Sequence, residues 1–317
     1  MQMAADKILK NISCREHIRL ANENDICAIR EIWRNIFTPK EDYLDIIFKY
    51  LYRVLDAFVF VIDEKIASVA FAIPMALFHR DENYTSSETY HGRYLYGVAT
   101  IEEARGRGLS RVLVEQIKDY YTAGCEDFII TRPAEESLFP FYKAQGFTQS
   151  LYRSERVIRI NQPSPTLDLN KNKIIAEEKK RSEDSSQTHL SGQSLFHLRA
   201  RQSTDMFIWG PYTLDCILHL AKTEENLIKF YPQTQKYIIA YFNGNNLIVE
   251  ENNFNSTDEL LHTINLEITR RVENITIFMP AGSNSESQTV EFALYMPLSG
   301  KISKEIVQKS FFNFTME

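Results

Sequence analysis

The chain has 317 residues, more than one hydrophobic core usually organises, so its length predicts two domains. Hydrophobic residues make up 44% and charged residues 25%, as in ordinary globular proteins. A formal charge of -6 gives no basic surface for nucleic acid, and the longest apolar stretch, 67–78, is too short for a membrane span. The stretch Met1–Asn11 has no apolar core, so we expect a cytoplasmic location, with neither nucleic acid nor membrane as a partner.

Four cysteines are scattered without any Cys-x-x-Cys pair: Cys14, Cys27, Cys125 and Cys216. This spacing argues against a structural zinc site or a disulfide framework, and we expect no metal. The simplest interpretation is small buried thiols, with a nucleophilic cysteine as the alternative.

The chain opens with a predicted strand and two helices. Residues 15–20 alternate polar and apolar side chains, and 24–37 carry apolar residues at helical spacing. Thr38 and Glu41 have the spacing of a capping box, which predicts a second helix running to about Leu55.

Strands follow. Two β-rich runs, 57–62 and 66–78, are joined by a short polar connection that suits an antiparallel hairpin. The polar stretch 79–88 is interpreted as a loop, 90–100 as another strand, and 109–123 as a helix stopped by a glycine.

The remaining elements of the first half are a strand at 127–131, a helix at 135–145 and a strand pair at 147–160. Hairpins combined with one strand-helix-strand unit predict an α+β (α/β three-layer) domain over residues 1–160.

Residues 161–194 form a predicted linker, because large apolar residues become rare and a charged, serine-rich run appears. The stretch 195–317 predicts a second, smaller mixed α/β domain. Its expected elements are helices at 215–230 and 257–271, a hairpin of 237–242 with 247–250, and strands at 275–279 and 289–296.

The main chemical signal is the segment Arg105-Gly106-Arg107-Gly108-Leu109-Ser110, which lies between a strand and a helix. That order places unpaired backbone N–H groups at the positive end of a helix, and glycines let an anion approach closely. A dinucleotide fingerprint would need a third glycine where Arg111 stands, and a Walker loop would need Gly-Lys-Ser/Thr, which Gly300-Lys301-Ile302 does not provide.

The segment resembles the pyrophosphate loop of the GNAT acetyltransferase superfamily, written Gln/Arg-x-x-Gly-x-Gly/Ala. Arg105, Gly108 and Ser110 occupy its signature positions, with Ser110 in place of Gly or Ala. The resemblance implies a GNAT-like mixed central sheet flanked by helices, and backbone N–H groups of 107–110 that hold the pyrophosphate of acetyl-CoA as co-substrate. It also implies that Val98 and Thr100 pair with the pantetheine arm.

A second match is Phe141-Tyr142-Lys143-Ala144-Gln145-Gly146-Phe147, which looks like the superfamily's Tyr-x-x-x-Gly-Phe. In that family the tyrosine protonates the departing thiolate, so the resemblance makes Tyr142 the candidate general acid. A phenol with a pKa near ~10 stays protonated at neutral pH and suits this role. The alternative is a tyrosine that only packs in a core.

The segment 132–142 departs from the commonest single-domain form, which has an Asn before this helix. It looks more like the tandem acetyltransferases of the enhanced-intracellular-survival type, whose second GNAT-like domain is degenerate, and residues 207–296 would fit that domain. Some members of that group use the terminal carboxylate as base, which makes Glu317 a candidate.

For the base within the first domain, the candidates in or beside the loop that borders the acceptor cleft by analogy are His79, Asp81, Glu82 and His91. Of these, His91 has a near-neutral ordinary pKa, and a water chain is the alternative. The leading hypothesis is an acyl-CoA-dependent N-acyltransferase that acetylates a primary amine on a small molecule or peptide by direct attack. The rival is a non-catalytic acyl-CoA-binding or sensing protein. A third hypothesis makes the second domain a dimerisation or partner-binding module, which leaves a homo-oligomer open.

Overall fold

A computed structural model describes residues 16–53, 55–80, 87–160, 190–202, 205–223, 226–267, 272–280 and 288–312. The first half contains β1 (Glu16–Leu20), α2 (Ile26–Phe37), α3 (Glu41–Tyr50), β2 (Asp56–Ile62), β3 (Lys65–Arg80), β4 (Ser87–Thr100), α4 (Leu109–Ala123), β5 (Phe128–Thr131), α5 (Phe139–Lys143) and β6 (Gln149–Arg159). The second half contains α7 (Gly192–Ala200), β7 (Met206–Trp209), α8 (Pro211–Thr223), β8 (Leu227–Tyr231), β9 (Lys236–Asn243), β10 (Asn246–Asn252), α9 (Thr257–Glu267), β11 (Asn274–Pro280), β12 (Gln288–Pro297) and α10 (Lys304–Lys309).

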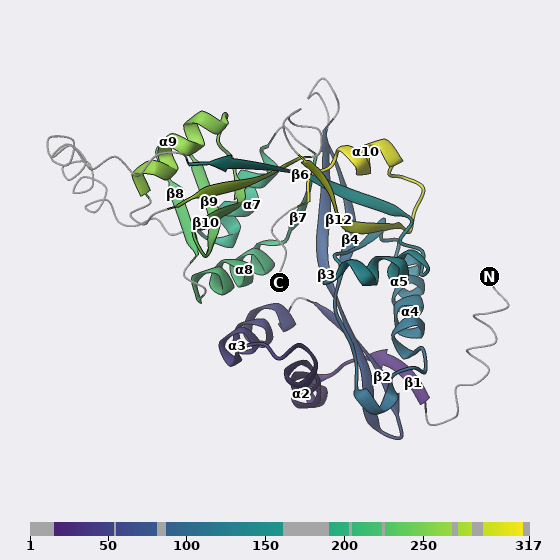
Figure 1. Cartoon of the computed structure of the whole chain (residues 1–317). Helices are drawn as coiled ribbons and strands as arrows, with labels where there is room; N and C mark the ends of the chain where they lie inside the picture. The colour runs from purple at the N-terminus through teal and green to yellow at the C-terminus, as the bar shows by residue number, and fades with distance from the viewer. Residues whose placement is uncertain are drawn as a thin grey trace, which may run out of the picture.

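The described strands form one twelve-stranded mixed sheet in the order β1-β2-β3-β4-β5-β12-β6-β11-β10-β9-β8, with β7 paired to β3 (Figure 1). Helices α4 and α5 cover one face beside β2 to β5, where Leu113, Ile117 and Tyr142 share a core cluster. Helices α2, α3, α7 and α8 share a larger cluster with the opposite face. The structure therefore confirms the predicted α+β fold with a mixed sheet flanked by helices.

The long strand β6 joins the two parts of the sheet. Its first residues pair with β12 from Gln149 to Glu155, and its last residues pair with β11 from Arg153 to Arg159. The sequence suggested a strand pair here, which is wrong, because no Gly, Pro, Asn or Asp interrupts β6 to turn the chain.

The last strand, β12, lies between β5 and β6, and its residues 292–296 are buried. Strands from the predicted second domain thus complete the sheet of the first, since β7 also extends the edge of β3 beyond the end of β2. The predicted boundaries at 160 and 195 stay predictions, and most of the predicted linker lies outside the described residues.

Local corrections concern the start of α3 and the end of α8. Thr38 ends α2 in the left-handed conformation, with φ 45°, so its side chain does not cap α3 and the predicted capping box is wrong. Glu41 instead accepts hydrogen bonds from Arg34 and Arg30. The predicted helix 215–230 is also too long, because residues 227–231 form β8 and pair with β9.

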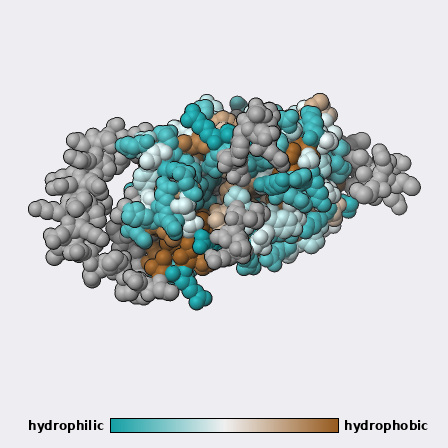
Figure 2. All heavy atoms as spheres, turned by 90° about the horizontal axis from the view of Figure 1, so that it is seen from above, coloured by the Kyte–Doolittle hydropathy of each residue, from teal (hydrophilic) through white to brown (hydrophobic). Residues whose placement is uncertain are grey.

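Apolar side chains are largely enclosed by this arrangement. Seen from above, the described surface is mostly hydrophilic, with the largest hydrophobic patch at the lower left and smaller ones at the upper centre and on the right (Figure 2). In the part of the chain that the structure describes, no helix is both long and apolar enough to cross a membrane.

Candidate acyl-transfer site

The turn between β4 and α4 has the geometry of an anion site. Gly106 and Gly108 both have φ +75°, a conformation that side-chain-bearing residues rarely adopt, and a Cβ at either glycine would meet no atom within 4 Å. No side chain caps α4, and among described residues no partner is recorded for the N–H groups of Leu109 and Ser110. The turn thus presents free donors beside open space at the positive end of a 15-residue helix.

The flanking arginines are held in place by the protein. Arg105 donates from Nε to the backbone oxygen of Thr100 at 3.3 Å, and Arg107 forms an ion pair with Glu16 at 2.5 Å. Leu109 is buried and anchors the first turn of α4 to the core, while Ser110 is half-buried. The predicted loop residues therefore form one turn, fixed from both sides.

Strands β4 and β5 separate beside this turn. They pair in parallel only from Gly92 with Phe128 to Tyr94 with Ile130, and β4 then continues to Thr100 without a β5 partner among the described residues. The hydroxyl of Thr131 donates to the backbone oxygen of Leu95 at 3.1 Å, at the point where the two strands part. An extended ligand can pair with a strand whose edge is opened in this way.

A β-bulge lies in the part of β4 that pairs with β3 and, within the described part of the chain, has no β5 partner. The register with β3 shifts between Tyr96 and Ala99, and Gly97 has φ +59°. A Cβ on Gly97 would lie 2.1 Å from Cζ2 of Trp33, so only glycine fits. Val98 lies in this bulge, and Thr100 at its end contacts the Ser68 hydroxyl at 2.9 Å.

Tyr142 lies on α5, close to the point where β4 and β5 separate. Its side chain is 8% exposed and belongs to the same core cluster as Leu109, at the start of α4. Burial raises the pKa of Tyr142 to about 12, and a hydrogen bond with Thr131 acts in the opposite direction. The phenol thus stays protonated at neutral pH, next to the residue that marks the opening between β4 and β5.

The structure does not bring His91 to this place. The N–H of Asp127 donates to the backbone oxygen of His91 at 2.7 Å, so His91 lies at the start of β5, whereas Thr131 and Tyr142 lie at its end. Asp127 and Thr131 are four positions apart along extended chain, which corresponds to roughly 13 Å at 3.3 Å per residue. Glu317 lies outside the described residues.

The side of β4 facing α2 and α3 carries an aromatic group that sequence patterns did not single out. Trp33 stacks on Phe71 with ring centroids 5.0 Å apart and meets Tyr96 edge-on at 5.4 Å. The hydroxyls of Tyr43 and Tyr96 are hydrogen-bonded, and loss of hydration raises the pKa of Tyr96 well above its ordinary value. In the sequence, the signal that could have pointed to this region was Gly97, because a single glycine inside a strand pattern often marks a β-bulge.

None of the described cysteines is placed as a nucleophile at this site. Cys27 and Cys125 are exposed, whereas Cys216 lies inside α8. Burial raises the pKa of the Cys216 thiol to about 12, so it stays protonated at neutral pH.

Comparison with known proteins agrees with this geometry. Residues 17–150 match the family model of the acetyltransferase (GNAT) domain, so this part of the chain is similar to that domain. No curated protein sequence matches the chain.

Solved structures extend the similarity to nearly the whole fold. A probable N-acyltransferase from Enterococcus faecalis V583 matches with a TM-score of 0.65 at 13% identity, over 89% of this chain and 73% of that one. A GCN5-related N-acetyltransferase from Anabaena variabilis matches with a TM-score of 0.63 at 14% identity, over 90% and 73%. Eis1 from Mycobacterium abscessus matches with a TM-score of 0.59 at 9% identity, over 89% and 74%. At these identities the matches show the fold alone.

Proposed function

We propose that the chain is an N-acetyltransferase that transfers an acetyl group from acetyl-CoA to a primary amine on a small molecule or peptide. The observation that carries the proposal is the turn 105–110, whose free N–H groups and two left-handed glycines lie beside the opening between β4 and β5. These residues fit a diphosphate, because the space that a Cβ would fill at Gly106 and Gly108 is open.

In this proposal Arg107, Gly108, Leu109 and Ser110 hold the pyrophosphate by backbone donors, while Arg105 and Gly106 shape the turn. The edge of β4 at Val98 and Thr100 aligns the pantetheine arm. Acetyl-CoA supplies an activated thioester, and the protein contributes chiefly positioning and hydrogen-bond donors.

Tyr142 acts as the general acid in this proposal. Its buried hydroxyl holds a proton at neutral pH and can deliver it to a thiolate leaving group close to the opening between β4 and β5. An acid with a high pKa remains protonated throughout the working range, so one proton is always available for each turnover. The attacking amine must lose a proton to a separate acceptor.

The proton acceptor for the attacking amine is a group other than Tyr142. His91 lies at the opposite end of β5 from Tyr142, so the geometry argues against His91 as the base and leaves Glu317 and a water chain as the candidates. A His91→Gln variant would therefore keep its turnover, whereas a base at His91 would make that variant slow.

Steady-state thiol release separates this proposal from the non-catalytic rival. Spermidine, a lysine-containing peptide and aniline represent three classes of amine, and a reaction without amine gives the background hydrolysis. We expect release above background with at least one aliphatic amine, together with an acetylated product in the mass spectrum. Micromolar CoA binding in calorimetry without release from any amine would favour the rival, which the lack of a carboxylate in Tyr94–Thr100 also favours.

A further inference from the structure

The second half of the molecule repeats the layout of the first site. Strands β10 and β11 are parallel and are connected through α9, and β10 has a bulge between Val249 and Glu251 where it pairs with β9. In the first half β4, α4 and β5 have the same order, and β4 also has a bulge. Ligands of open α/β sheets bind beyond the carboxyl ends of parallel strands, so the fold offers a second place for a ligand.

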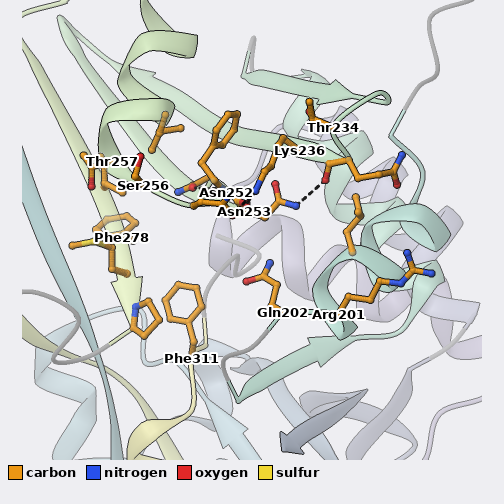
Figure 3. A pocket seen from close by; sticks show the side chains of 18 residues that line it. Arg201, Gln202, Thr234, Lys236, Asn252, Asn253, Ser256, Thr257, Phe278 and Phe311 are labelled. Carbon is orange, nitrogen blue, oxygen red and sulfur yellow. Dashed lines mark hydrogen bonds between the residues drawn. The ribbon is translucent and has the colours of Figure 1, made fainter. Parts of the chain in front are cut away.

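A cavity of about 790 Å³ lies at this second place (Figure 3). Its walls come from the ends of β10 and β11, the start of α9, the turn before β9 and the end of α7. Gln202 and Phe311 reach into it from one side, and Asn252 and Asn253 face them from the other (Figure 3). This volume is in the range of small-molecule sites.

The charged side chains that line the cavity favour a negatively charged ligand. Arg201 and Lys236 are both cationic, and no carboxylate lines the cavity among the described residues, although the whole chain carries -6. Lys236 donates to the backbone oxygen of Asn253 at 2.7 Å and to Asn255 at 2.8 Å. Arg201 is exposed at the edge of the cavity (Figure 3), and no hydrogen bond or ion pair joins it to the described part of the chain, so its guanidinium is available at the cavity rim.

A buried carboxylate behind the cavity wall is neutralised. Glu251 is 1% exposed and forms an ion pair with buried Arg199 at 3.1 Å. The Tyr237 hydroxyl donates to Glu251 and accepts a hydrogen bond from Gln202 at 3.0 Å. This chain of bonds holds Gln202 at the cavity wall and neutralises the Glu251 carboxylate.

The apolar side chains that line the cavity favour a ligand with an apolar or aromatic body. Phe278 and Phe311 are 7% and 6% exposed and are packed from behind, and the guanidinium of Arg153 lies 3.4 Å from the ring centroid of Phe278. Rings held in this way provide firm apolar walls.

From these observations we propose that this cavity binds a small organic anion whose apolar or aromatic body packs between Phe278 and Phe311 and whose anionic group pairs with Arg201. The cavity is separate from the turn 105–110, so the proposal does not depend on acetyl transfer.

Three probes with the same naphthalene body test it: 1-naphthyl phosphate, 1-naphthalenemethanol and 1-naphthylmethylammonium. Binding to the full chain is measured by calorimetry with saturating CoA, which occupies the first site. We expect the phosphate to bind at one site and more tightly than the other two probes. Arg201→Gln should weaken it about tenfold or more, the usual effect of losing a charge-assisted hydrogen bond.

Two further variants keep the test decisive. Arg201→Glu should reverse the preference, so that the ammonium probe binds better than the phosphate. Lys65→Gln removes a charge from an exposed hairpin far from the cavity and should leave all three affinities unchanged. Equal affinity for the three probes, unchanged phosphate affinity in Arg201→Gln, or a phosphate site lost only when CoA is added would each overturn the proposal.

Discussion

The two strand-helix-strand units of this molecule share a layout and differ in the turn that enters the helix. In the first unit Gly106 and Gly108 take left-handed conformations, and the N–H groups at the start of α4 are free. In the second unit the side chains of Asn252 and Ser256 accept hydrogen bonds from the N–H groups of Phe254 and Glu259, at 3.1 Å in both cases. In the second turn, backbone N–H groups are therefore already hydrogen-bonded to side chains, whereas in the first turn they are free.

In our proposals this difference lets one fold support two kinds of anion site. A turn with free backbone donors suits a diphosphate, because several N–H groups converge on one group without any charged side chain. A turn capped by its own side chains cannot do this, and the second cavity therefore depends on Arg201 and Lys236. The order of strand, helix and strand predicts where a ligand lies. The turn that enters the helix predicts which kind of anion binds there.

The largest effect is expected from separating the two units. A fragment of residues 1–160 lacks β12, so β5 and β6 each lose a partner strand from the middle of the sheet. We expect this fragment to aggregate or to give a poorly dispersed amide NMR spectrum, because buried strand edges would be exposed. A well-dispersed spectrum and intact CoA binding would show that the first half folds alone.

A point substitution tests the same strand in the full chain. Leu294 on β12 is fully buried, and Leu294→Ala should lower the free energy of unfolding by about 2–5 kcal/mol in urea titrations. Val157 on β6 is 60% exposed, and Val157→Ala should change it by only about 0.5 kcal/mol.

The next effect concerns the glycine turn. Gly108→Glu should abolish CoA binding in calorimetry, because the carboxylate enters the open space at the helix start and repels a diphosphate. Gly244→Glu is the matched control, since Gly244 also has a positive φ and open space around it but lies in the β9–β10 hairpin. Micromolar CoA affinity in Gly108→Glu would refute a diphosphate site at this turn.

Local patterns predicted the strand, turn and helix around residues 105–110 well, because these residues are close in sequence. The turn 105–110 and its helix depend on neighbouring residues, and glycine, strand and helix signals all agree there. Likewise the hairpin of β9 and β10 followed from a short polar turn between alternating strands.

Contacts between distant residues were not predictable in the same way. Nothing local in residues 288–297 indicates that β12 inserts between β5 and β6, because pairing in a sheet depends on strands far apart in the chain. The position of His91 relative to Tyr142 likewise depends on the register of β4 with β5. The second cavity combines α7, β9, β10 and β11, and no motif spans those elements.

A smaller effect is expected at the general acid. Tyr142→Phe should lower kcat by about 100-fold or more and leave CoA affinity nearly unchanged, because the ring still packs but no proton is available. Tyr121→Phe is the control, since Tyr121 is also buried in this core and its hydroxyl donates to Asp56 at 2.6 Å. Equal turnover in wild type and Tyr142→Phe would remove Tyr142 from the mechanism.

The bulge in β4 should tolerate change less than a turn with the same backbone conformation. Gly97→Ala should cost more than Gly244→Ala in unfolding free energy, because both glycines have a positive φ but only Gly97 lies against Trp33. The left-handed conformation alone costs about 1–2 kcal/mol, so the excess measures the steric contact. The difference in unfolding free energy between Gly97→Ala and Gly244→Ala should become smaller when Trp33 is also replaced by Leu. Equal losses of stability at the two glycines would mean that the Trp33 ring moves aside freely.

The smallest expected effect is on the pH dependence of kcat/KM. The raised pKa of Tyr142, about 12, means that folding favours its protonated form. Its contribution to stability is therefore complete below the ordinary pKa of 10.0 and is lost as the pH rises through about 12. Below about pH 10 the profiles of wild type and Tyr142→Phe should then differ in height and have the same shape. An alkaline decline near neutral pH that is present in wild type and absent from Tyr142→Phe would assign a much lower pKa to this phenol, and burial would no longer explain its protonation.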